Sequence, residues 1–167
     1  MHPGVRQLGP GSCPVCGMSL EPLALSSGTE SNTELMNMRR RFWASAALAV
    51  PLMVNSMAEM FGYELLKASV ASGIQLALAT PVVMWGGWPF LARAWRSVRT
   101  RQRNMFTLIG LGVLVAYLYS LVGVFAPDVF PATFRDAKGQ VGLYFEASAM
   151  IITLVLLGQW LELRARN

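Results

Sequence analysis

The chain has 167 residues, of which 54% are hydrophobic and only 14% are charged. Together with its long uncharged runs, this composition excludes an ordinary soluble domain and places the chain among membrane proteins. The formal net charge of +5 does not indicate nucleic-acid binding, because the arginines adjoin apolar segments, where basic residues set membrane orientation.

Residues 1–23 are rich in turn-forming residues and contain the only histidine and both cysteines, His2, Cys13 and Cys16. The Cys-Pro-Val-Cys-Gly spacing lets two thiolates face one ion, and the glycine permits the tight turn. We therefore predict a small knuckle that binds Cu(I) or Zn(II), with His2 and Met18 as the available further ligands. A pair of exposed reduced thiols, or the remnant of a larger site, is the alternative, whereas thioredoxin-like redox chemistry is disfavoured because no βαβ pattern surrounds the cysteines.

After a polar linker at residues 24–38, residues 39–167 are predicted to form an all-α membrane region. Polar residues such as Asn55 and Glu59 make the first apolar segment an imperfect one, but each segment is long enough to cross a hydrocarbon layer of about 30 Å. We expect two helical hairpins formed by four transmembrane helices, at about residues 42–61, 74–98, 105–125 and 141–163.

The second of these helices is predicted to kink at Gly86 and Gly87, because two residues without Cβ weaken a helix and Pro89 follows them. Beyond the kink the sequence is amphipathic, which is typical of a helix that lies along a membrane surface. We expect this helix to be a cytoplasmic platform where an acidic or cargo-carrying partner docks. Its apolar face would hold Phe90, Leu91, Ala94, Trp95 and Val98, and its basic face Arg93, Arg96, Arg99 and Arg103.

The distribution of basic residues predicts the orientation of the chain. Ten arginines flank one set of helix ends, whereas only Lys67, Arg135 and Lys138 flank the other. Because the more basic loops stay in the cytoplasm, both termini are expected on the cytoplasmic side of the cell (inner) membrane.

Ionisable residues at membrane depth are candidates for a function in transport. Topology places Glu146 near the external face and Glu162 about 24 Å further in, at the cytoplasmic level of Met105. A thioether and a carboxylate at one membrane entrance would suit transient capture of Cu(I). The alternative is that Glu162 is an interfacial carboxylate near Arg164 and that Met105 only fills space.

Several segments, in this order, resemble the start of copper-transporting P-type ATPases. They are the knuckle MHPGVRQLGPGSCPVCGMSLEP and the helical segments MRRRFW, LATPVVMWGGWPF, NMFTLIGLGVLVAYLYS and YFEASAMIITLVLLGQWLELRAR. The resemblance implies a Cu(I) exporter driven by ATP through a phosphoaspartate, in which a copper chaperone or metal-binding domain delivers the ion at the kinked helix. It also implies that Met105 and Glu162 are the ligands at the entrance and that Glu146 is on the exit side.

The chain also departs from that family's pattern. Family knuckles usually have a cysteine before the Met-His-Pro that opens this sequence, so we expect the knuckle to be incomplete. The actuator loop, the Cys-Pro-Cys and Asp-Lys-Thr-Gly motifs and a nucleotide-binding domain are not among the 167 residues. We therefore expect the front portion of a pump, which needs ATP and Mg²⁺ only in a full-length parent. The alternative is a stand-alone four-helix membrane protein that binds metal or scaffolds a partner without turnover.

Overall fold

The structure is a computed structural model that describes residues 4–6, 8, 13, 29–63, 68–99, 101, 105–135 and 139–166. Within these ranges the fold is helical, and its only β-type pairing is an isolated bridge between Arg135 and Val141. The helices are α1 (Thr29–Met60), α2 (Ala68–Pro81), α3 (Trp88–Arg99), α4 (Met105–Phe125) and α5 (Phe145–Arg166).

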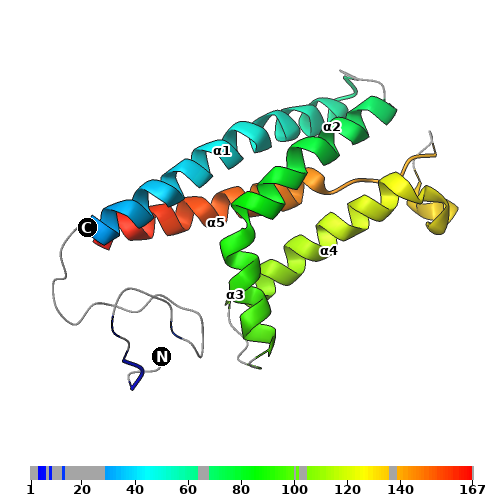
Figure 1. The fold of residues 1–167 in the computed structure, drawn as a ribbon. Coiled ribbons are helices and arrows are strands. Elements are labelled where there is room, and N and C mark those ends of the chain that lie inside the picture. The colour runs from blue at the N-terminus through cyan, green and yellow to red at the C-terminus, as the bar shows by residue number, and fades with distance from the viewer. Residues whose placement is uncertain are drawn as a thin grey trace.

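The two longest helices, α1 and α5, share the most extensive contact in the bundle. They lie side by side and antiparallel, so the start of α1 is next to the end of α5 (Figure 1). At that end the rings of Phe42 and Trp160 stack with their centroids 5.6 Å apart. Leu52, Phe145 and Leu156 are fully buried further along and belong to the hydrophobic core of the bundle.

Among the described residues, α4 and α5 are each long and apolar enough to cross a membrane. The bent pair formed by Val70–Gly86 and Trp88–Arg99 makes a third candidate if it counts as one span. Four spans were predicted, whereas two or three of the described helices are candidate spans by length and composition. The predicted first span, α1, does not qualify alone, because polar residues such as Asn55 and Glu59 interrupt its apolar segment.

Several helix ends differ from the predicted ones. α1 begins at Thr29, so residues 29–38 of the predicted linker at 24–38 are helical. Hydropathy marks only the apolar part of a helix, and the polar turns before Phe42 contain no glycine or proline to stop the helix. α5 begins at Phe145 rather than at Val141, because Val141 pairs with Arg135 instead. α4 covers the same range, Met105–Phe125, as the predicted helix.

The connection between α2 and α3 is a sharp bend. α2 continues into a π-helical turn at Val82–Gly86, in which the backbone N–H of Gly87 donates to the carbonyl of Val82 at 2.9 Å. After Gly87 the chain resumes as α3, and the helices before and after the break differ in direction by 61°. A π-helical turn contains an extra residue, so it weakens the regular helix where the direction changes.

Both glycines at the bend are required by the close approach of neighbouring helices. A Cβ added at Gly86 would lie 2.5 Å from the Oγ of Ser45 in α1. A Cβ added at Gly87 would lie 2.5 Å from the carbonyl oxygen of Val83 and 2.6 Å from Cδ1 of Ile152 in α5. The bend therefore packs directly against α1 and α5, which fixes where α3 starts.

The loop between α4 and α5 is organised by Arg135. Its guanidinium donates to the carbonyls of Pro127 at 3.0 Å and Phe130 at 3.1 Å, and it forms an ion pair with Asp128 at 3.4 Å. One side chain thus holds both short 3₁₀ turns, Pro127–Val129 and Ala132–Phe134, at the end of the bundle remote from α3.

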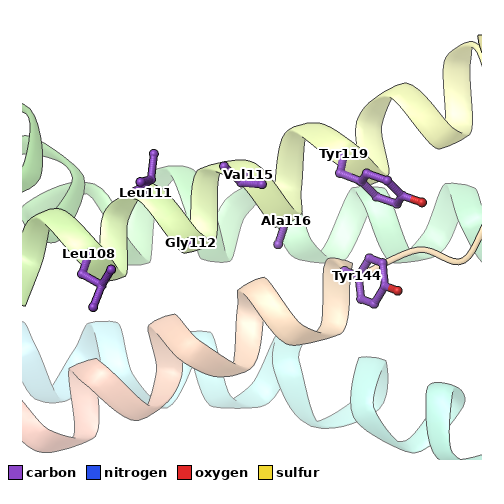
Figure 2. Close-up of a pocket in the computed structure, with 7 residues that line it drawn as sticks. All are labelled: Leu108, Leu111, Gly112, Val115, Ala116, Tyr119 and Tyr144. Carbon is purple, nitrogen blue, oxygen red and sulfur yellow. The ribbon is translucent and has the colours of Figure 1, made fainter.

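An open apolar groove of about 450 Å³ runs along α4. Figure 2 shows that α4 supplies most of the lining and that Tyr144, just before α5, faces Tyr119. Because the groove and the surrounding leucines and valines are exposed, this side of α4 is suited to lipid or to another apolar helix. The residues that line the groove are Leu108, Leu111, Gly112, Val115, Ala116, Tyr119 and Tyr144.

We expect Gly87→Ala to destabilise the fold by about 1–3 kcal/mol, because its Cβ would overlap a backbone carbonyl and Ile152. The matched control is Gly112→Ala, where the added Cβ meets no described atom within 4 Å. Thermal unfolding of both variants in lipid nanodiscs, followed by circular dichroism, measures the difference. Equal melting temperatures for the two variants would contradict the close packing at the bend.

Candidate functional site

Arg41 of α1 supports the bend from the side. Its guanidinium donates to the backbone carbonyl of Trp85, within the π-helical turn, and lies 5.0 Å from the centroid of the Trp85 ring. A π-helical turn leaves a carbonyl without its usual α-helical partner, and an arginine is well suited to satisfy it. Nothing in the sequence separates Arg41 from Arg39 and Arg40, which are exposed.

The apolar face predicted for α3 divides into two parts. Phe90 and Ala94 are buried, because they pack against α4, and a Cβ added at Gly110 of α4 would lie only 2.6 Å from the Cβ of Ala94. Trp95 and Val98 are exposed, with 74% and 58% of their surface accessible. Part of the predicted apolar face therefore holds α3 on the bundle, and the exposed part contains Trp95 and Val98.

The arginines of α3 also differ from one another. Arg96 and Arg99 are exposed, as a docking platform requires, whereas Arg93 is half-buried. Arg103, the fourth predicted member of the platform, lies outside the described residues. The exposed cations lie on the same helix as the exposed rings of Trp88 and Trp95, so this surface combines positive charge with aromatic area.

Arg93 reaches from α3 to both α4 and α5. Its Nη1 donates to Oε1 of Gln159 at 3.2 Å, and its Cζ lies 5.4 Å from the centroid of the Phe106 ring. Gln159 in turn donates through Nε2 to Oε2 of Glu162 at 3.1 Å. Arg93 is therefore connected through one amide to the carboxylate predicted at the entrance.

Met105 and Glu162 both lie at the end of the bundle where Arg93 contacts α4 and α5. Met105 is the first residue of α4, next to the Phe106 that Arg93 covers, and 65% of its surface is accessible. Glu162 is exposed near the end of α5 and interacts electrostatically with Arg93, as does Glu34 of α1. The carboxylate of Glu162 is thus linked to Arg93, whereas Met105 lies at the same end of the bundle, next to the Phe106 that Arg93 contacts.

Glu146, the predicted residue on the exit side, begins α5 at the other end. It lies in hydrogen-bonding range of Ser56 and in electrostatic range of Glu59, both on α1. Glu59 accepts a hydrogen bond from Nδ2 of Asn55 at 2.7 Å. In the sequence Glu59 was only an irregularity in an apolar segment, because nothing there showed which helix would face it.

The predicted knuckle is mostly outside the described residues, and this holds for His2 and Cys16. Cys13 is described and is buried, with 3% of its surface accessible. In the part of the chain that the structure covers, no three His, Cys, Asp or Glu side chains gather closely enough to hold a metal ion. The knuckle and its ligands therefore stay a prediction.

The sequence of the chain is similar to known metal transporters over its whole length. Residues 1–23 match the family described as heavy metal binding domain. A copper-exporting P-type ATPase of Legionella pneumophila is 51% identical over all 167 residues. A silver exporting P-type ATPase of Salmonella typhimurium and a copper-transporting P-type ATPase of Rhizobium leguminosarum are each 51% identical and also cover 100% of the chain.

These similarities and the apolar helices define a metal-binding membrane protein of the ion-transport class. Within that class, the chain belongs to the copper-transporting P-type ATPases. It spans 23%, 21% and 20% of the lengths of the three relatives.

We expect Arg41→Ala to lower the free energy of unfolding by about 1–3 kcal/mol, because it leaves the Trp85 carbonyl unpaired and removes a cation–π contact. Arg40→Ala, which removes an exposed neighbour, should change it by less than about 0.5 kcal/mol. Denaturant unfolding followed by tryptophan fluorescence compares the two variants. If Arg40→Ala lowers the free energy of unfolding as much as Arg41→Ala, the contact of Arg41 with Trp85 does not stabilise the fold.

Proposed function

We propose that this chain forms the cytoplasmic entrance of an ATP-driven Cu(I) exporter, with a docking platform on α3 and ion ligands at Met105 and Glu162. The observation that carries the proposal is the meeting of α3, α4 and α5 around Arg93, at the end of the bundle that holds Met105 and Glu162. Sequence identity of 51% with a copper-exporting relative, over the full chain, supports copper as the ion.

The two ligands suit the task because they bind weakly and differently. A thioether is a soft ligand that favours Cu(I) over hard cations such as Mg²⁺, and a carboxylate adds charge attraction without tight binding. Met105 is exposed and so is open to an arriving ion. Glu146 lies sixteen residues before Glu162 on the same helix, about 24 Å away, which suits a role on the exit side.

The platform would receive Cu(I) from an acidic-faced copper chaperone or from a metal-binding domain. Arg96 and Arg99 provide the positive charge, and Trp88 and Trp95 provide exposed aromatic surface beside it. Charge complementarity of this kind speeds the encounter of two proteins more than it strengthens the complex. In this proposal α3 lies along the cytoplasmic surface of the inner membrane and both termini are cytoplasmic.

The other parts of the proposed exporter would lie around this entrance. The knuckle at residues 1–23, with Cys13 and Cys16, would hold Cu(I) or Zn(II). The long α1 would cross the membrane against α5, as the fourth span. ATP and Mg²⁺ would act in catalytic domains that the 167 residues do not include. A stand-alone scaffold, the other candidate, has no specific observation in its favour.

The ion ligands can be tested on the chain in lipid nanodiscs, with Cys13→Ser and Cys16→Ser present so that the knuckle does not bind the probe. Glu162→Gln and Met105→Leu should each weaken Cu(I) binding roughly tenfold, as measured by competition with a chromogenic Cu(I) chelator. Glu59→Gln, a carboxylate change at the other end of α1, should leave the affinity unchanged. Unchanged affinity in both Glu162→Gln and Met105→Leu would remove them from the path of the ion.

The platform can be tested by reversing its charge. Arg96→Glu with Arg99→Glu should slow Cu(I) transfer from an acidic-faced chaperone at least tenfold at low salt and less at high salt, because surface charges are screened. Uptake from a small neutral Cu(I) complex should not change. If delivery by both routes slows equally, the basic surface of α3 is not a docking site.

A further inference from the structure

Arg93 has a different environment from the other arginines of α3. It lies on the same helix as Arg96 and Arg99, yet it is half-buried. Its guanidinium contacts Gln159 of α5 and the Phe106 ring of α4. A docking residue must stay accessible to a partner, whereas Arg93 is committed to contacts inside the bundle. We propose that Arg93 is the resident counter-cation of the ion entrance, and that it holds Glu162 through Gln159 until Cu(I) takes its place.

The relay from Arg93 to Glu162 has only one consistent hydrogen-bond polarity. Arginine can only donate, so the Oε1 of Gln159 must face Arg93, at 3.2 Å from Nη1. A carboxylate can only accept, so the Nε2 of Gln159 must face Glu162, at 3.1 Å from Oε2. Gln159 therefore fits between the two ions in one orientation, and it transmits the position of Arg93 to the carboxylate.

The charge of Arg93 is balanced by more than one partner. Glu34 at the start of α1 and Glu162 on α5 both interact with it electrostatically, and the ring of Phe106 lies under its guanidinium. These contacts keep a full positive charge at the place where a monovalent cation would arrive. Cu(I) must then compete with Arg93 for the same carboxylate, which keeps the ion loosely bound and ready to move on.

The relay also connects docking to ion uptake. Arg93 belongs to α3, whereas Gln159 and Glu162 belong to α5, so any shift of α3 changes the length of the relay. A partner that binds the exposed Arg96 and Arg99 would shift α3, the helix that carries Arg93. Docking would thus release Glu162 at the moment when the ion is delivered. This inference rests on the proposed function, because it assumes that Glu162 binds the ion.

The test measures Cu(I) affinity in nanodiscs by chelator competition, again with Cys13→Ser and Cys16→Ser present. Arg93→Gln should bind Cu(I) roughly three- to tenfold more tightly, the effect of removing one unit charge several ångströms away in a medium of intermediate dielectric. Arg40→Gln, an exposed change on α1 outside the platform, should stay within about twofold of the parent. Arg93→Lys keeps the charge and should restore the parent affinity.

A second variant keeps the test informative if Arg93→Gln does not fold, which circular dichroism and thermal unfolding will show. Gln159→Leu interrupts the relay from α5 and retains the arginine, so it should also tighten Cu(I) binding. If neither Arg93→Gln nor Gln159→Leu differs from Arg40→Gln while Glu162→Gln still weakens binding, the relay is overturned and the proposed function stands. If Glu162→Gln and Met105→Leu both leave the affinity unchanged, the proposed function itself fails.

Discussion

The arrangement of the whole bundle depends on how closely the bend at Gly86 and Gly87 approaches α1 and α5. The Oγ of Ser45 and the Cδ1 of Ile152 occupy the space that side chains at these two positions would need. Because the bend cannot move away from its neighbours without opening a void, the start and the direction of α3 are fixed. That direction in turn lets Arg93 reach Gln159 on α5.

The parts of the fold that could be predicted are those that local sequence decides. Met105–Phe125 is an uninterrupted apolar run, so its limits follow from hydropathy. The break after Gly86 follows from two adjacent glycines and a proline. The start of α1 at Thr29 could not be predicted in this way, because polar turns carry no hydropathy signal. Whether α1 spans the membrane could not be predicted from its length, because Asn55 and Glu59 lower its hydropathy below that of α4 and α5.

For the candidate site, topology predicted Met105 and Glu162 at one level, but the sequence could not show which arginine contacts α4 and α5 there. Arg93, Arg96 and Arg99 recur every three residues and look equivalent in a helical pattern. Which one turns inward depends on the contacts of α3 with α4, where Ala94 fits against Gly110. Arg41 poses the same problem, because only the bend gives it a role different from that of Arg40.

The π-helical turn at Val82–Gly86 has a consequence for how such a surface can change during evolution. Successive residues of an α-helix are rotated by about 100°, so the loss of one residue from that turn would rotate all of α3 about its axis. Every cation beyond the turn would then face a new direction, with the composition of α3 and its hydropathy unaltered. The length of the turn at Val82–Gly86 therefore acts together with the contacts of α3 with α4 in setting which surface of the protein is basic.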